Sequence, residues 1–345
     1  MIGRCLATLL LLLAAGPAAA RPVVAILADP SGVETTDLMA PYAILTASGA
    51  VEVKVVSPTA APVPLMPGVA WIKPQETQAD FDRRYRQGAD MIIVPFLMNP
   101  KDPARAAWLR AQAKQGVRIV SICDGALVLA EAGLLDGRAA TAHWASQSAR
   151  ERRFPSVVWR QDVRWVTDGQ ITTTAGVSAS APASLILLGE LAGDAVMQDT
   201  ARRLGLLAPV RAHDAGAYRL DGEAMGTAAG NVLGFWRREQ VAIELRDGFD
   251  ELAFGAALDG WSRTYRGEAY AVAPAGGVIS RGGLTVFASD RLPAFERRVQ
   301  LAEYAPIEVM LDEVEDAYGR STAQFVALQL EHPRWTAKGP KPPAP

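Results

Sequence analysis

Short apolar runs alternate with longer amphipathic stretches along the N-terminal half of the chain. Four of these runs are rich in valine and isoleucine and have the length of buried strands: 22–29, 51–58, 89–96 and 117–123. Residues 35–48 and 103–116 have helical spacing, and 79–88 is polar. Strands that alternate with helices predict a parallel sheet covered on both faces. Thr36 or Asp37 can cap the first helix, and Gly116 ends the second.

A similar order of elements returns after a polar connection. From Val241 the chain again shows a strand, an acidic turn, a helix and a strand that ends in proline. Glu251 then falls where Asp37 lies in the first half. We interpret this part as a truncated α/β repeat without chemistry of its own, because it contains no second cysteine at a strand end. Chance similarity between two ordinary βαβ-like segments is the alternative.

These patterns divide the chain into consecutive segments. They are a signal peptide at 1–20, a main α/β domain at 21–205, a helical connection at 206–240, a partial α/β repeat at 241–335 and a Pro/Lys-rich tail at 336–345. The connection should carry a helix around 230–238, and 305–333 should form a long helix or a helix pair.

The first segment has the features of an export signal. An early arginine precedes a leucine-rich run, Gly16-Pro17 breaks it, and small residues end at Ala20, where we expect cleavage. The apolar part is shorter than the roughly 20 residues of a membrane span, although a retained anchor is the alternative. We therefore expect a periplasmic or secreted protein without stable membrane insertion. Cleavage removes Cys5 and leaves Cys123 alone, so no intramolecular disulfide can form.

The composition of the chain limits the classes of binding partner that we expect. The 35 basic and 37 acidic residues form no long run of one sign, which argues against nucleic-acid binding and favours a small-molecule substrate or ligand. The 3 histidines lack ligand-like spacing, so we expect neither a metal nor another cofactor. His213 and Asp214 lie in the polar connection, and we interpret this pair as structural.

Cys123 stands at the boundary between an apolar strand and a helix. Carboxyl ends of parallel strands are where ligands bind in such sheets. Gly125 allows a tight turn, and the following helix N-terminus favours a thiolate. This arrangement is typical of a nucleophile elbow, so we predict a thiol pKa below the unperturbed value of about 8.5. A small buried hydrophobic side chain is the alternative.

The segment "SICDGALVLAEAGLLDGRAATAHW" resembles the ThiJ/PfpI family of the class I glutamine amidotransferase-like superfamily, and the resemblance extends over about 22–205. It implies a flavodoxin-like doubly wound parallel sheet with a nucleophile elbow. It also implies that Asp37 approaches Cys123 and that His143 completes the site, although Glu34 is a competing carboxylate and His143 could only pack or cap. The loop "TTTAGVSAS", with Gly176 and Ser178, should lie beside the pocket.

Two positions depart from the family pattern. Where many members have Gly-Gly, this chain has Phe96 and Leu97, whose bulk narrows the pocket, although a backbone N–H there can still stabilise an oxyanion. Asp124 follows the cysteine where relatives have other side chains. Its carboxylate would raise the thiol pKa if it pointed at sulfur, and we favour the alternative that it complements the helix dipole.

Two classes of function follow. One is a cysteine-dependent hydrolase, lyase or deglycase, in which the Cys123 thiolate attacks a small electrophile, Asp37 relays a proton and His143 assists. The other is a non-catalytic binding or oxidation-sensing domain.

Independently of the function, we expect the second half to pack on the first as a pseudo-dimer within the chain, imitating the subunit contact of dimeric relatives.

Overall fold

The computed structural model describes residues 20–234, 236, 238–274, 276–303 and 306–336. All of the expected signal peptide except Ala20, and all of the expected tail except Thr336, lie outside the described residues. No helix in the described ranges is both long and apolar enough to cross a membrane.

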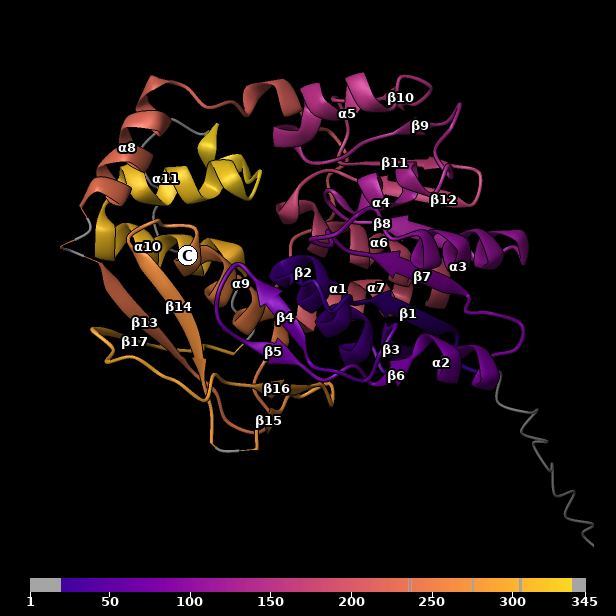
Figure 1. The fold of residues 1–345 in the computed structure, drawn as a ribbon, viewed down its shortest axis with the longest axis horizontal. Helices are drawn as coiled ribbons and strands as arrows, with labels where there is room; N and C mark the ends of the chain where they lie inside the picture. Colours follow the sequence, from indigo (N-terminus) through magenta and orange to yellow (C-terminus); the bar gives the residue numbers. More distant parts are fainter. Residues whose placement is uncertain (1–19, 235, 237, 275, 304–305, 337–345) are drawn as a thin grey trace, which may run out of the picture.

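A seven-stranded sheet forms the core of the first half (Figure 1). Its order is β11-β12-β8-β7-β1-β3-β6, and every pairing is parallel except that of β11 with β12. The strands are β1 (Val23–Leu27), β3 (Glu52–Ser57), β6 (Glu76–Thr77), β7 (Met91–Val94), β8 (Arg118–Ser121), β11 (Trp165–Asp168) and β12 (Ile171–Thr174). The prediction of an α/β fold with a mainly parallel sheet is confirmed, and all four expected strands are present.

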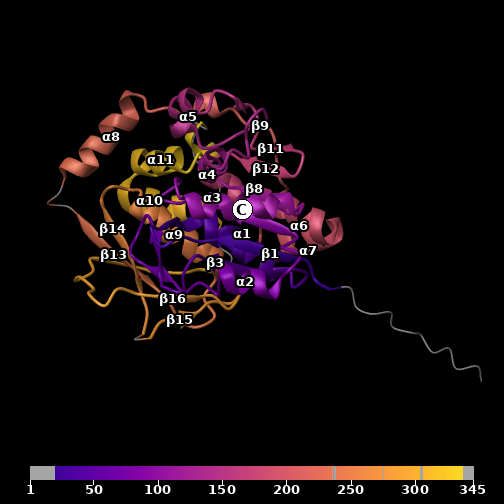
Figure 2. The ribbon, with the colours of Figure 1, turned by 45° about the vertical axis from the view of Figure 1, so that its right-hand side comes forward.

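Helices cover both faces of this sheet. The chain moves one way from β1 to β3 and the other way from β7 to β8, so right-handed crossovers place the intervening helices on opposite faces. One face carries α1 (Thr35–Ala47), α6 (Ser180–Ala192) and α7 (Asp194–Arg203), and the other carries α2 (Gln78–Arg84), α3 (Pro103–Lys114) and α4 (Gly125–Glu131). Figure 2 shows the same layers from a second direction.

The start of α1 differs from the expected one. Glu34, and not Thr36 or Asp37, caps the helix, because its carboxylate accepts the Asp37 backbone N–H at 2.5 Å. Most of the polar stretch 79–88 belongs to α2, which is capped by Thr77. Gly116, with a φ of 85°, follows α3 as predicted.

The second half contains a smaller parallel sheet of order β14-β13-β17. Its strands are β13 (Glu239–Glu244), β14 (Gly267–Val272) and β17 (Arg297–Gln300), and its helices are α9 (Glu251–Ser262), α10 (Ile307–Tyr318) and α11 (Arg320–Gln329). The expected helix pair is present and is divided at Gly319. The connection forms α8 (Gly222–Leu233), which begins earlier than the helix expected around 230–238 because Asp221 caps it; residues 235 and 237 of the expected range lie outside the described residues.

The two halves of the chain are joined by a sheet to which both contribute strands and by a contact between two helices. A five-stranded sheet joins β15 (Val278–Ile279) and β16 (Thr285–Phe287) to β5 (Trp71–Ile72), β4 (Val63–Met66) and β2 (Val33–Glu34). Helix α1 packs on α9, where a Cβ on Gly255 would lie only 2.8 Å from Met39 Cβ. The remaining elements are β9 (Ala139–Ala140), β10 (Val158–Trp159), α5 (Gln147–Arg153), and short 3-10 helices at 144–146, 177–179, 215–217 and 333–335.

Candidate functional site

Cys123 occupies a tight turn between β8 and α4. Its φ of 55° lies in the left-handed region, which is unfavourable for a residue with a side chain. The turn also needs Gly125, because a Cβ there would lie 2.0 Å from the Val94 carbonyl oxygen. The Cys123 N–H donates to the Ala175 carbonyl at 3.1 Å. The surrounding strands therefore hold the backbone of Cys123 in a strained conformation.

The thiol lines a cavity of about 280 Å³ that both halves of the chain enclose. Phe96, Asp124 and His143 come from the first half, as expected, and so does Glu34. The second half contributes Ser262, Arg263, Tyr265 and Gln329. The site is therefore completed by residues that follow Cys123 by more than a hundred positions, and no pattern in the sequence signalled them.

Asp37 is completely buried and interacts with the thiol electrostatically. Its carboxylate accepts the Phe96 backbone N–H at 3.2 Å and the Ser180 hydroxyl at 3.3 Å. Burial raises the pKa of Asp37 to about 7, so both of its protonation states are populated near neutral pH. The expected oxyanion donor, the N–H of Phe96, is already engaged by this carboxylate.

A cluster of carboxyl groups surrounds Asp37. Arg263 donates to Glu34 Oε1 at 2.9 Å through Nη2 and to Asp259 through Nε. Burial, followed by the charges of Asp259 and Asp37, raises the pKa of Glu34 well above its ordinary value. A single arginine therefore faces several carboxyl groups here, of which Glu34 lines the cavity.

The thiol itself is affected by these charges. Burial raises the pKa of the Cys123 thiol well above its ordinary value, and the charges of Asp37 and Asp124 raise it further. A hydrogen bond from the Asp124 backbone N–H acts in the opposite direction but is the smaller effect. The prediction of a lowered thiol pKa is therefore wrong, because burial of the thiol and the nearby carboxylate charges outweigh the hydrogen bond from the backbone at the helix start.

Asp124 also differs from our interpretation. Its side chain makes no cap hydrogen bond to α4 and instead accepts the Ser146 hydroxyl at 2.6 Å. Burial raises its pKa, and its carboxyl lines the cavity beside Cys123. It therefore acts on the thiol rather than on the helix dipole.

Both ring nitrogens of His143 contact backbone groups. Nε2 lies 2.9 Å from the Gln329 carbonyl oxygen, to which it donates, and Nδ1 accepts the Ala145 N–H at 3.2 Å. A carbonyl can only accept, so this geometry corresponds to the neutral tautomer with the proton on Nε2. No lone pair is then free to take a proton from Cys123, which favours a positioning role over the expected role as a base.

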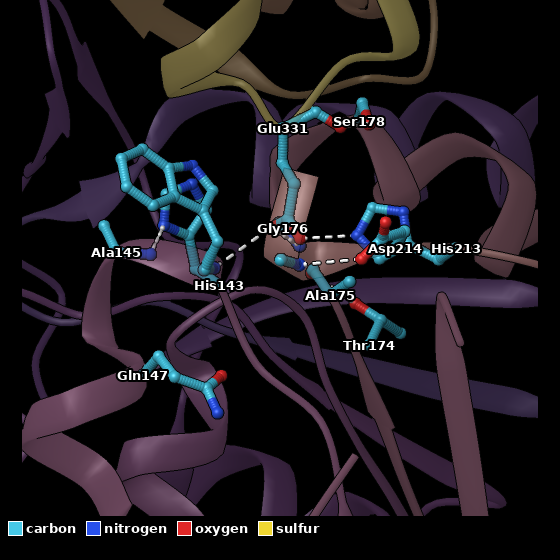
Figure 3. A network of polar contacts seen from close by, with 12 residues as sticks. His143, Ala145, Gln147, Thr174, Ala175, Gly176, Ser178, His213, Asp214 and Glu331 are labelled. Carbon is cyan, nitrogen blue, oxygen red and sulfur yellow. Dashed lines mark hydrogen bonds and ion pairs between the residues drawn. The ribbon is translucent and has the colours of Figure 1, made fainter. Parts of the chain in front are cut away.

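Glu331 ties the C-terminal segment to the cysteine domain (Figure 3). Its Oε2 accepts the backbone N–H groups of Gly176 at 2.7 Å and Trp144 at 3.2 Å, and its Oε1 lies 2.6 Å from His213 Nε2. The Ser178 hydroxyl donates to the Glu331 carbonyl at 2.7 Å. Gly176 and Ser178 therefore hold this segment and do not line the thiol cavity.

The pair of His213 and Asp214 is used structurally. His213 is buried against Glu331, and Asp214 accepts the Gly216 N–H at 3.0 Å in a local turn. Within the described ranges, no group of three or more His, Cys, Asp or Glu side chains is arranged to hold a metal ion.

The class that this fold defines, an α/β protein with a mainly parallel sheet, also contains the proteins to which the chain is similar. Residues 22–187 match the DJ-1/PfpI family. Isonitrile hydratase of Pseudomonas putida is 33% identical over 194 residues, which are 54% of this chain and 78% of that protein. The chain belongs to the DJ-1/PfpI family, and the resemblance found in the sequence is confirmed.

Other similar proteins include a transcriptional regulator and a protein of solved structure. The HTH-type transcriptional regulator CdhR of Pseudomonas aeruginosa is 36% identical over 113 residues, so the match spans 33% of that regulator and 32% of this chain. The crystal structure of Drosophila melanogaster DJ-1beta is 21% identical, with a TM-score of 0.49, and the alignment covers 55% of this chain and all of that one.

Proposed function

We propose that this protein is a cysteine-dependent enzyme that acts on a small electrophilic substrate, with a hydratase, hydrolase, lyase or deglycase type of reaction. One observation carries the proposal. Cys123 is held in a strained conformation at the wall of a cavity, and the buried Asp37 carboxyl, whose pKa is about 7, interacts electrostatically with its thiol. Strained residues and carboxyl groups that titrate near neutral pH are typical of catalytic sites.

The charges around the cavity favour an uncharged substrate. Glu34 and Asp124 line the cavity, and Arg263 is already paired with Glu34 and Asp259. An anion would therefore meet carboxyl groups without a free arginine to offset them. A volume of about 280 Å³ also limits the substrate to a small molecule.

Hydration of an isonitrile illustrates how the residues would act. The sulfur of Cys123 bonds to the terminal carbon as its proton passes to the Asp37 carboxylate, and Asp37 then protonates that carbon to give a thioimidate. Water adds to the thioimidate carbon, the C–S bond breaks, and a proton returns to sulfur. The product is an N-substituted formamide, and both residues are regenerated.

Turnover of tert-butyl isonitrile and of methylglyoxal by the purified chain tests the proposal. Cys123→Ser should lower kcat/KM for the accepted substrate by about a thousandfold or more, because it removes the nucleophile. Asp37→Asn should lower kcat, whereas Asp290→Asn, an exposed carboxylate outside the site, should leave it unchanged. Equal turnover by Cys123→Ser and the unaltered chain would contradict the assignment.

A binding or sensing role is the second candidate. Two observations favour it. The raised thiol pKa makes Cys123 a weaker nucleophile at neutral pH, and both His143 ring nitrogens are engaged, so His143 cannot act as a base. The similarity to part of CdhR is consistent with it. This candidate would be favoured over the enzyme if a probe binds saturably, no product forms, and Cys123→Ser leaves the rate of binding unchanged. Oxidation sensing gains less support, because oxidation proceeds through the thiolate.

We keep the proposal that the chain does not bind nucleic acid, although several relatives are HTH-type regulators. Its C-terminal helix pair is formed by α10 and α11. Helix α10 contains Glu308, Asp312, Glu313, Glu315 and Asp316, so it presents negative rather than positive charge. Such a helix would be repelled by a phosphate backbone.

We also propose that residues 241–335 are a truncated repeat that forms a pseudo-dimer with the first half. Strand β13 lies between two parallel neighbours and leads into α9, as β1 does for α1. Their caps, Glu34 and Asp250, differ by 250 − 34 = 216 positions. With this offset, Thr36 of α1 is equivalent to Leu252 of α9, and Ala43 is equivalent to Asp259. The contacts between the two helices are reciprocal in this register. Thr36 donates a hydrogen bond to Asp259, and Ala43 packs near Leu252.

This register corrects one expected equivalence. Glu251 corresponds to Thr35, and Ala253 corresponds to Asp37, so Glu251 does not fall where Asp37 lies. Glu251 accepts the Gly282 N–H at 2.5 Å and has no thiol partner. This agrees with a repeat that has no chemistry of its own.

Export to the periplasm or beyond remains a proposal that rests on residues 1–20. Cleavage after Ala20 should give a native chain that begins at Arg21. N-terminal sequencing of protein from fractionated cells measures this directly. Recovery of chains that begin at Met1 in the cytoplasmic fraction would contradict it.

A further inference from the structure

A second cavity, of about 590 Å³, lies between the two halves and does not include Cys123. Helices α1 and α6 and the connection at 205–212 form one side, and α9 and the start of α10 form the other. Its size falls within the range of about 300–1,000 Å³ that is typical of small-molecule sites. Neither the proposed reaction nor the similarity to known proteins assigns it a role.

Most of the wall of this cavity is aliphatic. Leu185 of α6, Leu206 of the connection, Leu252 of α9 and Ile307 of α10 all face it. At its edge, Leu207 also lines the cavity and is 81% exposed, so the cavity is open to solvent there. An aliphatic group that enters from this edge would bury apolar surface at about 25 cal/mol per Å².

A cationic side chain, that of Arg164, lies among these residues. Arg164 lines the cavity, and its buried Nε has no hydrogen-bond partner in the described part of the chain. Glu308, the nearby carboxylate, instead accepts a hydrogen bond from His332 Nε2 at 3.1 Å, which with the weaker effect of the Arg164 charge lowers its pKa. A guanidinium presents several donors in a fork that matches a carboxylate, so Arg164 retains the capacity to bind one.

The start of α10 provides a second, independent attraction for an anion. Pro306, Ile307 and Glu308 line the cavity, and Pro306 precedes this 12-residue helix without a side-chain cap. The N-terminal end of a helix carries partial positive charge. An anionic group near Arg164 would therefore also be stabilised by α10, although it must avoid the Glu308 carboxylate.

We propose that this cavity is a binding site for a small monocarboxylate with an aliphatic tail. The carboxylate pairs with Arg164, and the tail lies along Leu185, Leu206 and Leu252 toward the interior. Because α1 and α9 both contribute to its wall, a bound ligand contacts both halves of the chain and stabilises their association.

Isothermal titration of the full chain with decanoate and with decanol tests this site. The unaltered protein should bind decanoate more tightly than decanol. Arg164→Gln should weaken decanoate binding about tenfold or more, because a charged hydrogen bond is lost, and should change decanol binding little. Leu206→Trp should weaken both ligands by filling the cavity.

Matched variants separate this site from the thiol cavity. Arg160→Gln removes an exposed arginine that pairs with Asp162 and should leave decanoate binding unchanged. Cys123→Ser should also leave it unchanged, even if it abolishes turnover. The proposal is overturned if the unaltered chain does not bind decanoate, if Arg164→Gln binds it equally well, or if Cys123→Ser removes the binding.

Discussion

Alkylation of Cys123 by iodoacetamide should be slow at neutral pH and should accelerate only above the ordinary thiol range of about 8.5. Burial and the charges of Asp37 and Asp124 disfavour the thiolate, which is the reactive form. Asp37→Asn removes one of these charges. Above pH 7, where Asp37 is ionised, this variant should react roughly tenfold faster, and below pH 7 the difference should shrink because the native carboxyl is then protonated.

Two further variants serve as a comparison and a control in this experiment. Glu34→Gln should have a smaller effect than Asp37→Asn, because the charge of Glu34 raises the thiol pKa less than the charge of Asp37 does. Asp290→Asn changes an exposed carboxylate and should leave the rate profile unchanged. Mass spectrometry identifies the labelled residue. A native thiol that titrates at or below about 8.5, or one that is indifferent to Asp37, would contradict the electrostatic account.

Glu331→Gln should lower the free energy of unfolding by about 3–5 kcal/mol, because the buried carboxylate is hydrogen-bonded to Gly176, Trp144 and His213 and each hydrogen bond to a charged group contributes about 1.5–3 kcal/mol. The substitution leaves His213 without its carboxylate and sets an amide NH2 or a weaker acceptor against the N–H groups of Gly176 and Trp144. Urea unfolding followed by tryptophan fluorescence measures the change.

The control for this prediction is Glu303→Gln, because the side chain of Glu303 is 81% exposed and only weakly paired with Arg281. Gly176→Ala should also destabilise the protein, since its Cβ would lie 2.3 Å from Glu331 Oε2. If Glu331→Gln costs no more than Glu303→Gln, the C-terminal segment is not held through this carboxylate.

The sequence was most informative where the signal is local. The four apolar runs and the helix that ends at Gly116 follow from periodicity within short windows, which reflects how each element buries one face. Cys123 at the end of a strand, with Gly125 after it, likewise required only neighbouring residues. The ends of helices are harder to predict from local sequence. Glu34, Thr36 and Asp37 are all chemically able to cap α1, and tertiary contacts select among them.

The sequence by itself determined the parallel α/β fold of the first half, the family and the position of the cysteine turn. The tertiary structure alone decided the sign of the thiol pKa, the orientation of Asp124 and the residues that close the cavity. Arg263, Tyr265 and Gln329 reach the site from elements far along the chain. Electrostatic energies depend on distances between charges and on burial, and neither quantity exists until distant segments have packed together.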